Sequence, residues 1–524
     1  MIGYEKIHTH ALTRPDGLAL ADRSTTLTWA QFAARVAAAT RSLAALLPPA
    51  GARPRIAVLG ASTVDVVVLQ SAAATLRVPL VGIDHSLPDA SVAGCLAQIR
   101  PAVLAASPER VDLAARALAL VGDVDLPPVL LALGPGPAGD RPGWTQWTPG
   151  SDGRGSDDPA TAPADLVPGW QAPPFEGLGF TSGTSGLPKL VLRSRSFEAR
   201  RHQDVVDRFE VTARDVYLNT VPLFHASAAG WARVFLTEGA PVVVAGELPA
   251  ADMLRLAARH GATASLMVPP TLAAVVAALQ DDATVPAPPL RMLVTGGRQV
   301  SPALVRDVVD RWGHVLHVYY GTTETGLNTL ALPADLAEDP TTVGRPFPGN
   351  DITVIDAAGR PVPPGTAGTV AIGGYMLADG FATAPAPLVT VDGRPYWRTA
   401  DTGRIDAHGR LTVLGRDLDG RSYDVVGTEA RLRELPCLRD AAVHVAVTPR
   451  PSAVAAYVRA GGEPGDGAGA RLDEIVTRTV AATLGIADVR TLPVARIPYS
   501  PSGKVRFAEL AALRGAVHDE PAAA

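Results

Sequence analysis

Residues 181–189 read TSGTSGLPK, which combines two glycines, four hydroxyl side chains and a closing lysine. Glycine lets the backbone bend around a ligand, and successive backbone N–H groups in such a loop can converge on an anion. The hydroxyl groups can donate hydrogen bonds to phosphate oxygens or help to hold a metal ion, and Lys189 adds a positive charge. The stretch therefore predicts a phosphate-binding loop, with a flexible surface turn as the alternative that its composition also allows.

The segments on either side of this loop are short and apolar. Residues 177–180 predict a strand and residues 190–192 its return, so the loop is expected to join two strands. The loop is not a Walker-type P-loop, because no G-x-x-x-x-G-K-[ST] motif occurs in the chain. A G-x-G-x-x-G sequence begins at Gly134, but Pro135 and Pro137 interrupt it and no helix pattern follows, which excludes a dinucleotide site there.

The composition predicts a globular protein that keeps its cysteines reduced. The 524 residues are 47% hydrophobic and 19% charged, and the net charge of -5 argues against a nucleic-acid binder. The two cysteines, Cys95 and Cys437, indicate neither a disulfide framework nor a zinc site and fit the cytoplasm. No signal core and no apolar run of membrane-spanning length occurs, so we expect no membrane span.

The first part of the chain alternates between strand and helix patterns. Residues 28–47 predict an amphipathic helix that begins with a capping box formed by Thr28 and Gln31. Such alternation predicts a parallel sheet covered by helices. The further predicted elements are a helix at 63–76 and strands at 55–59, 78–83, 103–104 and 129–133. Residues 134–174 are rich in Pro, Gly and Asp and predict a long loop.

The same pattern resumes after the glycine-rich loop and then gives way to strands. We expect strands at 241–245, 264–268, 292–295 and 315–320, with helices at 250–260 and 301–312. The predicted fold class is α/β, with a large N-terminal domain of α/β layers, a β-rich subdomain from residue 351, and a small mobile C-terminal α+β domain. The predicted boundaries are 1–414 for the large domain, 415–419 for a hinge, 420–511 for the small domain and 512–524 for a tail.

Further polar segments follow predicted strands or lie near the C-terminus. They are LVTGGRQV at 293–300, YYGTTETG at 319–326, YWRTADTGRID at 396–406 and PYSPSGKVR at 498–506. Glu324 can hold Mg²⁺ near phosphate oxygens, and Asp401 can accept hydrogen bonds from ribose hydroxyls. Three residues that could belong to a site also have a plainer interpretation. Asp401 could be a turn residue, Lys504 in the last of these segments a solvated lysine, and His225 a core histidine.

The order and spacing of these segments resemble the adenylate-forming superfamily, which includes acyl-CoA synthetases, aryl-CoA ligases, peptide-synthetase adenylation domains and firefly luciferase. The resemblance extends from about residue 28 to residue 510, and its motifs are most similar to those of acyl- and aryl-CoA ligases.

The resemblance implies a role for each matching residue. It implies Lys504, Thr323, Glu324 and His225 as catalytic residues, with His225 in the wall of the acid pocket, and Glu324 with Thr184 as metal ligands. The implied cofactor-binding residues are Thr181, Ser182, Gly183, Thr184, Ser185, Gly186, Lys189, Gly297, Arg298, Tyr320, Gly321, Thr322, Thr323, Asp401, Arg416 and Lys504.

Residues 415–443 depart from the pattern of the superfamily. The hinge position falls on Leu418, and Gly427 is the nearest candidate for the glycine of the loop that follows. The next helix is predicted to be short, with only residues 431–435 left. In the superfamily this region forms the thiol tunnel, so adenylation is expected to be intact while the use of coenzyme A is in doubt.

The resemblance implies an enzyme that uses ATP and Mg²⁺ to convert an aryl or acyl carboxylic acid into an acyl-adenylate and pyrophosphate. The acyl group would pass to a thiol, first of all that of coenzyme A. A carrier protein or a non-thiol nucleophile is the enzymatic alternative, and a nucleotide- or acyl-binding protein without catalysis is the non-enzymatic one. Peptide-synthetase adenylation domains have an Asp where His225 falls, which makes amino-acid activation the weaker hypothesis.

Overall fold

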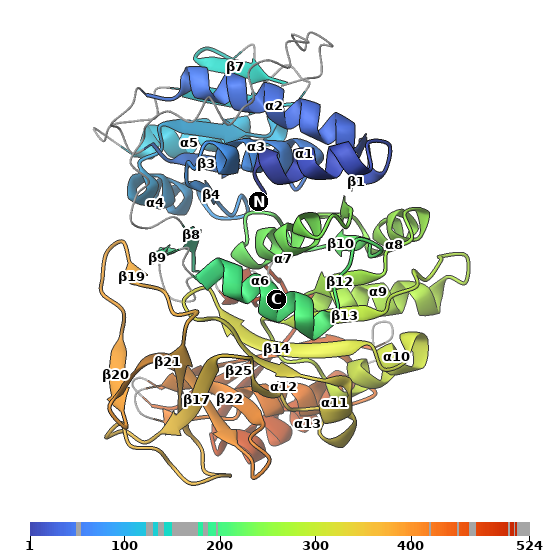
Figure 1. Cartoon of the computed structure of the whole chain (residues 1–524). Helices are drawn as coiled ribbons and strands as arrows, with labels where there is room; N and C mark the ends of the chain where they lie inside the picture. Colours follow the sequence, from blue (N-terminus) through green and yellow to red (C-terminus); the bar gives the residue numbers. More distant parts are fainter. Residues whose placement is uncertain are drawn as a thin grey trace, which may run out of the picture.

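The computed structural model places most of the chain in layers of helix and sheet (Figure 1). It describes residues 1–48, 54–121, 129–134, 141–148, 177–181, 187–194, 197–418, 421–447, 450–460, 468–500, 503–507 and 509–510. The predictions for Ser182, Gly183, Thr184, Ser185 and Gly186 lie outside these residues.

The N-terminal layer contains a parallel sheet in the strand order β4-β3-β5-β6-β7. Its strands are β3 (Ile56–Leu59), β4 (Leu80–Gly82), β5 (Val103–Ala106), β6 (Val129–Leu133) and β7 (Trp144–Trp147). Its helices are α1 (Tyr4–Thr13), α2 (Trp29–Leu46), α3 (Val64–Thr75), α4 (Asp89–Ile99) and α5 (Val111–Leu120), with a 3-10 turn at Pro108–Arg110. Alternate residues of β3 explain the layering, because Ile56 and Val58 pack with α2 and α3 while Ala57 and Leu59 pack with α4 and α5.

Two features of this layer test the sequence predictions. The capping box is confirmed, because Thr28 Oγ1 accepts a hydrogen bond from Gln31 N and Gln31 Oε1 accepts one from Thr28 N. The prediction that residues 134–174 form only a loop is wrong for β7, which pairs with β6. Trp144 and Trp147 are buried on opposite faces of the sheet. The stabilisation from burying these two side chains outweighs the preference of the surrounding residues for turns.

The central layer is a longer sheet in the order β16-β15-β14-β13-β12-β10-β11-β1-β2. From β14 to β1 its strands are parallel, and antiparallel strands close both ends. The strands are β1 (Leu18–Ala21), β2 (Thr26–Thr28), β10 (Tyr217–Asn219), β11 (Val242–Val244), β12 (Ala264–Met267), β13 (Met292–Gly296), β14 (Leu316–Thr322), β15 (Gly326–Ala331) and β16 (Arg345–Pro346).

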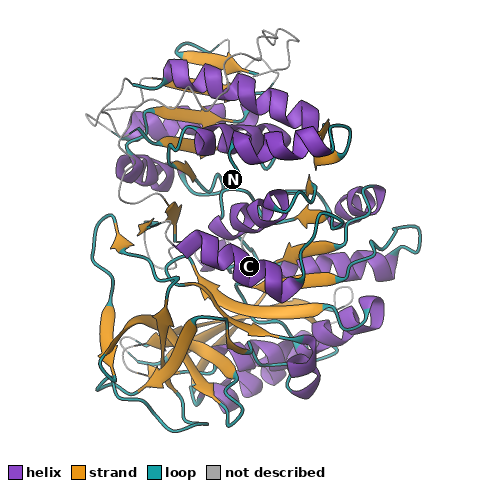
Figure 2. Cartoon of the chain, in the orientation of Figure 1, coloured by secondary structure: helices purple, strands orange, loops and turns teal. Residues whose placement is uncertain are grey.

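Helices cover both faces of the central sheet (Figure 2). Helices α6 and α7 share a core with the N-terminal layer, whereas α8, α9 and α10 pack on the other face. The bounds are α6 (Glu198–Phe209), α7 (Ala226–Thr237), α8 (Ala250–Arg259), α9 (Pro269–Asp281), α10 (Pro302–Trp312) and the short α11 (Pro333–Glu338). The parallel strands at the centre of both sheets, with helices on their faces, confirm the α/β fold class that the sequence predicted.

The glycine-rich loop is attached to a small sheet of its own. Strands β8 (Gly177–Phe180) and β9 (Leu190–Arg193) pair antiparallel on either side of it, as predicted, and β19 (Gly380–Phe381) pairs with β9. Paired strands therefore hold the residues on either side of the loop in place.

The β-rich part is an antiparallel sheet in the order β17-β18-β21-β22-β23, with β20 paired to β21. Its strands are β17 (Asn350–Ile355), β18 (Gly368–Gly374), β20 (Leu388–Val391), β21 (Arg394–Ile405), β22 (Leu411–Leu418) and β23 (Arg421–Ser422). Strands β21 and β22 matter for the site, because they carry Asp401 and Arg416 at directly paired positions.

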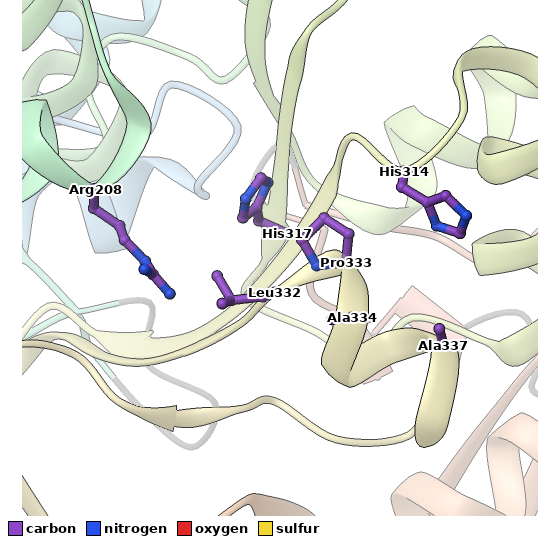
Figure 3. Close-up of a pocket in the computed structure, with 7 residues that line it drawn as sticks. All are labelled: Arg208, His314, His317, Leu332, Pro333, Ala334 and Ala337. Atoms are coloured by element: carbon purple, nitrogen blue, oxygen red, sulfur yellow. The ribbon is translucent and has the colours of Figure 1, made fainter.

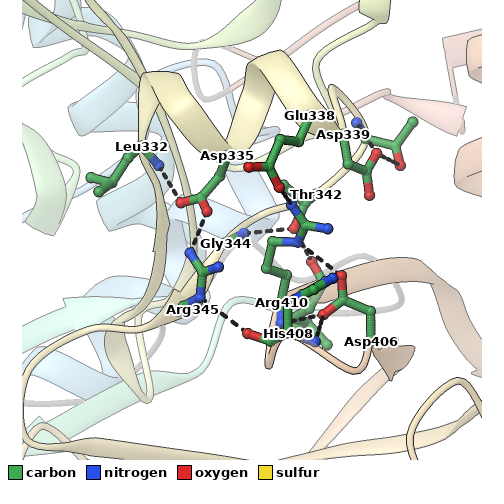
Figure 4. A network of polar contacts seen from close by, with 12 residues as sticks. Leu332, Asp335, Glu338, Asp339, Thr342, Gly344, Arg345, Asp406, His408 and Arg410 are labelled. Carbon is green, nitrogen blue, oxygen red and sulfur yellow. Dashed lines mark hydrogen bonds and ion pairs between the residues drawn. The ribbon is translucent and has the colours of Figure 1, made fainter.

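A polar network fixes the β21–β22 hairpin to the central layer (Figure 4). Arg410 donates to Asp406 Oδ2 at 2.8 Å within the hairpin turn and to Glu338 Oε2 on α11 at 2.6 Å. Arg345 on β16 pairs with Asp335 and donates to the His408 carbonyl oxygen at 3.1 Å. These charged groups hold the hairpin at its far end and so fix the position of the strands that carry Asp401 and Arg416.

The C-terminal residues form α+β structure with cores of their own. Strands β24 (Leu438–Ala446), β25 (Ser452–Arg459) and β26 (Asp488–Pro493) make a sheet, and helices α12 (Val425–Arg433) and α13 (Ala468–Leu484) pack on one of its faces. Ile497 and Leu510 pack on the other face. We call this part the small domain; its predicted boundary at residues 415–419 stays a prediction.

The interpretation of Gly427 as a loop glycine is wrong. Gly427 lies in the first turn of α12, where its N–H donates to Asp424 Oδ1 at 2.8 Å. Asp424 is an N-cap residue, a role in which its carboxylate satisfies an otherwise unpaired helical N–H. The helix therefore begins at Val425, earlier than the predicted 431–435, and only the short β22–β23 hairpin precedes it.

None of the helices in the described part of the chain combines the length and the apolar character needed to cross a bilayer.

Candidate active site

The turn between β14 and β15 carries the predicted metal and phosphate ligands. Gly321 permits this tight hairpin, because a Cβ atom there would lie 2.2 Å from a carbonyl oxygen of the facing strand. The Thr322 hydroxyl accepts from Thr325 N at 3.2 Å and lies 2.9 Å from the Thr325 hydroxyl, which closes the turn. Thr323 and Glu324, between them, are therefore held on an ordered backbone.

Two further contacts hold this turn, and sequence reasoning missed both. Arg193, at the end of β9, donates from Nη2 to the Thr323 carbonyl oxygen, and Ala378 N donates to the Glu324 carbonyl oxygen at 2.7 Å. Burial lowers the pKa of Arg193 to about 10, and the charge of Glu324 acts in the opposite direction. Arg193 is thus a positioning residue; its only signal in the sequence was an arginine at the end of an apolar strand.

The predicted ribose contacts form one polar cluster. Asp401 and Arg416 are paired across β21 and β22, with Arg416 Nε 3.5 Å from Asp401 Oδ1. Tyr320, on β14, donates its hydroxyl to Asp401 Oδ2 at 2.8 Å. Burial, and then the negative charge of Asp401, raises the pKa of Tyr320 well above its usual value. A carboxylate held in this way can accept hydrogen bonds from ribose hydroxyls.

The glycine pair that ends β13 lies beside this cluster. A Cβ atom on Gly296 would lie 2.5 Å from Tyr319 Cδ1, and Gly297 has a φ of 81°, which favours glycine. The backbone therefore passes directly against the neighbouring strand β14. The roles of Tyr320 and Gly297 in cofactor binding stay predictions.

The base of the glycine-rich loop is closed by contacts between its two ends. Thr181 N donates to the Lys189 carbonyl oxygen at 3.0 Å, and Lys189 N donates to the Thr181 hydroxyl at 3.3 Å. The Lys189 ammonium lies 5.5 Å from the ring centroid of Phe381. Both ends of the predicted phosphate loop are therefore fixed.

Lys504 follows Gly503 in a tight turn of the small domain that rests on the large domain. Lys504 N donates to the Ser500 hydroxyl at 3.1 Å, and Ser500 N donates to the Lys504 carbonyl oxygen at 2.7 Å. Gly503 has a φ of 79°, and a Cβ atom there would lie 3.1 Å from Val268 Cβ and 3.2 Å from Pro270 Cδ. A side chain at this position would push the turn away from the large domain.

The charge of Lys504 lies within electrostatic reach of the β14–β15 turn and the ribose cluster. Burial lowers the pKa of Lys504, the positive charge of Arg416 lowers it further, and the charges of Glu324 and Asp401 act to raise it. The docked small domain therefore brings one cation to the carboxylates that are predicted to bind metal and ribose.

His225 occupies the N-cap position of α7, without a capping hydrogen bond from its side chain, and is half-buried in the same region. Burial lowers the pKa of His225 to about 4; the charge of Asp84 opposes this shift and that of Lys504 adds to it. Its Nε2 atom and Gln299 Oε1 are buried polar atoms with no hydrogen-bond partner among the described residues. Both belong to segments predicted to shape the acid pocket, where a ligand can supply the missing partner.

Arg298, predicted as a cofactor-binding residue, has its side chain in contact with the small domain. Its Nη2 donates to Glu429 Oε2 on α12 at 2.6 Å, and its guanidinium lies 4.9 Å from the ring centroid of Tyr499. The side chains of Arg298 and Glu429 are only 12% and 10% exposed. The structure thus joins the loop after β13 to the small domain through a buried ion pair.

The ion pair belongs to a larger network within the small domain. Arg433 donates to Glu429 Oε2 at 3.0 Å and to Asp440 Oδ1 at 3.0 Å, and the Tyr499 hydroxyl donates to Asp440. Glu429 also accepts from a backbone N–H of β24 at 2.9 Å. The positive charges of Arg298 and Arg433 outweigh the effect of burial and lower the pKa of Glu429.

The residues present fit Mg²⁺ and ATP. Within the described part of the chain no group of three His, Cys, Asp or Glu side chains could hold a metal ion by itself. Mg²⁺ is usually bound by one or two carboxylates together with phosphate oxygens and water, which suits Glu324 beside a nucleotide. Asp401 and Arg416 would hold the ribose, and Lys189 and Lys504 would face the phosphates.

A separate open groove of about 610 Å³ lies elsewhere on the large domain (Figure 3). Arg208, His314 and His317 line it together with residues around the start of α11. It lies by the beginning of β14, whereas the predicted site residues lie at the other end of that strand and in the turn after it. The groove is therefore not part of the candidate site.

The fold and the gathered residues fit the family of AMP-binding enzymes. Residues 7–382 match the family model of the AMP-binding enzymes, and the chain belongs to this family.

Several known proteins are similar to this chain. A salicylyl-CoA synthase/salicylate adenylyltransferase from Streptomyces sp is 33% identical over 280 residues, which cover 50% of this chain and 49% of that protein. Indoleacetate–CoA ligase from Aromatoleum aromaticum is 27% identical over 453 residues, 84% of each chain. Among solved structures, amide bond synthetase McbA from Marinactinospora thermotolerans aligns with a TM-score of 0.77 and 25% identity over 98% of this chain and 99% of its own.

We expect Arg298→Ala to loosen the small domain, because it removes one of the two arginines that neutralise the buried Glu429. Loss of one charge-assisted contact typically costs about 1.5–3 kcal/mol. Hydrogen exchange of the backbone amides of α12 should become faster by a corresponding factor. Arg255→Ala, which removes a half-exposed partner of Asp252 on α8, is the matched control. Unchanged hydrogen exchange in Arg298→Ala would show that this ion pair does not hold the small domain in place.

We expect His225 to make stability depend on pH. Its pKa of about 4 in the folded chain lies below the usual 6.5, so between these values only the unfolded chain binds the proton. Stability is therefore complete above pH 6.5 and falls as the pH drops toward 4, by at most about 1.4 kcal/mol per pH unit for this residue. Denaturant unfolding at several pH values should show a smaller loss in His225→Asn, but not in His8→Asn. Equal slopes in all three proteins would contradict the burial of a neutral His225.

Proposed function

We propose that the protein uses ATP and Mg²⁺ to convert a carboxylic acid into an acyl-adenylate, with release of pyrophosphate. The observation that carries this proposal is the docked turn of the small domain: Gly503 packs against Val268 and Pro270, and the charge of the adjacent Lys504 lies within electrostatic reach of Arg416, Glu324 and Asp401. A cation, a metal-binding carboxylate and a ribose-binding pair are the groups that the reaction requires.

Each group has a defined task in this proposal. The carboxylate oxygen of the acid attacks the α-phosphorus of ATP, a new C–O–P linkage forms, and pyrophosphate leaves with the electron pair of the broken P–O bond. Lys504 offsets the repulsion between the carboxylate and the phosphates, and it stabilises the negative charge that develops on the α-phosphate. Asp401 and Arg416 orient the ribose, and Glu324 would hold the metal ion, which would supply positive charge to the phosphates.

The proposed acid is an aryl or acyl carboxylic acid. His225 and Gln299 offer unpaired buried polar atoms in the predicted acid pocket, and the ring of His225 lies 4.5 Å from that of Phe224. The names of similar proteins support aromatic acids, since they include a salicylate adenylyltransferase and an indoleacetate–CoA ligase. His225 also provides no carboxylate for the amino group of an amino acid.

Two kinds of molecule are candidates for the acceptor of the acyl group. The CoA-ligase names among the relatives favour the thiol of coenzyme A. Two observations favour a non-thiol nucleophile: the segment before α12 departs from the pattern of the superfamily, and the chain is similar to an amide bond synthetase. A catalytically inactive nucleotide-binding protein is the non-enzymatic alternative, and a turnover assay separates it from both.

Pyrophosphate should be released only when ATP, Mg²⁺ and a suitable carboxylic acid are all present. A panel of aryl, arylalkyl and aliphatic acids, assayed with a coupled pyrophosphatase, measures this directly. Omission of the acid and omission of Mg²⁺ are the controls. If no acid in a broad panel supports release, the proposed enzyme function is contradicted.

Lys504→Ala should lose most adenylation while ATP binding to the large domain persists. Removal of one group that stabilises transition-state charge costs about 2.7–4 kcal/mol, or roughly 100- to 1,000-fold in rate. Lys504→Arg should also be impaired, because a planar guanidinium does not replace a compact ammonium. Lys6→Ala is the matched control, on the surface of α1. Near-normal adenylation by both Lys504 variants would show that another residue provides the cation.

Glu324→Gln should need more Mg²⁺, because a neutral amide is a poorer ligand than a carboxylate for a hard cation. The Mg²⁺ titration of acid-dependent pyrophosphate release should shift to higher concentration, on the order of tenfold for a loss of about 1.4 kcal/mol. Excess Mg²⁺ should restore part of the rate. An unchanged titration would exclude Glu324 as a metal ligand.

A further inference from the structure

A second cavity, of about 270 Å³, lies between the large domain and the turn that carries Lys504. Glu247, Val268 and Pro270 line it on the side of the large domain, and Tyr499 and Gly503 line it on the side of the small domain. The volume suits a small molecule, on the order of nine water volumes at about 30 Å³ each.

The position of this cavity suits a second substrate. It lies where the chain leaves the carboxyl ends of β10, β11 and β12, the same edge of the sheet from which the site loops leave β13 and β14. Lys504 directly follows Gly503, which lines the cavity, and the charges of Asp401 and Arg416, the predicted ribose contacts, act on Lys504. A molecule in the cavity would therefore lie beside the turn that carries Lys504.

Glu247 gives this cavity its chemical character. Among the described residues that line the cavity, Glu247 is the only one with a charged side chain, and this side chain is 38% exposed. Its Oε1 atom lies 2.7 Å from Nε2 of His85, which is 4% exposed, although the direction of the N–H is not that of an aligned hydrogen bond. This contact, together with the charge of Arg110, lowers the pKa of Glu247, so the carboxylate is ionised at neutral pH.

His85 also connects the cavity to the predicted acid pocket. Its ring packs against the edge of the Phe224 ring at 5.5 Å, and the Phe224 ring lies 4.5 Å from that of His225. The carboxylate of Glu247 and the pocket wall at His225 are thus joined by a continuous line of packed side chains.

We propose that this cavity binds the acyl acceptor and that the acceptor is a small amine, held by the carboxylate of Glu247. The proposal rests on the adenylation function proposed above and defines its second step. A carboxylate attracts an ammonium group by a charge-assisted hydrogen bond. The same negative charge disfavours ionisation of a thiol to the reactive thiolate, so the cavity favours an amine over a thiol.

The reaction that follows is amide formation. The bound ammonium group loses one proton through Glu247 to solvent, and the nitrogen lone pair then attacks the carbonyl carbon of the acyl-adenylate. A C–N bond forms, the C–O bond to the phosphate breaks, and AMP leaves with the electron pair. The nitrogen loses a second proton by the same route, which gives the neutral amide.

The test compares an amine with a thiol of the same shape. The full chain, with the acid that gives the highest pyrophosphate release, is offered 2-phenylethylamine, 2-phenylethanethiol or coenzyme A, and products are quantified by mass spectrometry. We expect faster amide than thioester formation. Glu247→Gln should raise the KM for the amine roughly 10- to 100-fold, as expected for the loss of one charge-assisted contact, and should not slow thioester formation from the matched thiol.

Two further variants complete the test. Glu238→Gln removes the carboxylate of another His–Glu pair, with 2.7 Å between His202 Nε2 and Glu238 Oε1, and should leave the KM for the amine unchanged. Glu247→Asp keeps the charge and should retain part of the preference for the amine, which also covers the case in which Glu247→Gln fails to fold.

The outcomes separate this inference from the proposed function. If acyl-adenylate forms but thiols react faster than the amine, or if Glu247→Gln and Glu238→Gln have the same KM for the amine, the inference is overturned while adenylation stands. If no acid in the panel supports pyrophosphate release, the adenylation function fails and the inference falls with it.

Discussion

The site depends on one constraint: a lysine on the small domain must be held, half-buried, within electrostatic reach of the carboxylates of the large domain. Burial opposes the charge of Lys504, and Glu324 and Asp401 counteract this effect. Such an arrangement requires the small domain to be docked precisely. The contact of Gly503 with Val268 and the buried Arg298–Glu429 ion pair provide that docking. Breaking a buried ion pair leaves an uncompensated charge, so the pair specifies one docked arrangement even though its net contribution to stability can be small.

Much of the fold could be predicted from local patterns, because its elements carry strong local signals. The capping box at Thr28 and the apolar strands of both parallel sheets are examples. The strand at Trp144–Trp147 could not be predicted, since only the packing of its tryptophans on opposite faces overrides a loop-like composition. The helix at Gly427 was misjudged for a related reason: an N-cap at Asp424 and tertiary packing stabilise a helix that contains a glycine.

The candidate site shows the same division. Motifs were sufficient to select Glu324, Asp401 and Lys504, whose chemistry is visible in single residues. They could not select Arg193, or the use of Arg298 at the domain interface, because these depend on contacts between distant segments. One signal in the sequence did point to the site: of 47 basic residues only Lys6, Lys189 and Lys504 are lysines, and the last two are predicted phosphate contacts. A compact ammonium ion on a flexible stem is kept there although arginine is used almost everywhere else.

The central claim is that Lys504 acts on the nucleotide when the small domain is docked as described here. A crystal structure of the full chain with a non-hydrolysable acyl-sulfamoyl adenosine, made from an acid that the enzyme activates, tests it most directly. The account predicts the Lys504 ammonium within hydrogen-bond distance of the sulfamoyl or acyl oxygens, the ribose hydroxyls on Asp401, and the Arg298–Glu429 pair intact. A bound nucleotide that contacts Asp401 while Lys504 points to solvent from a docked small domain would contradict the account.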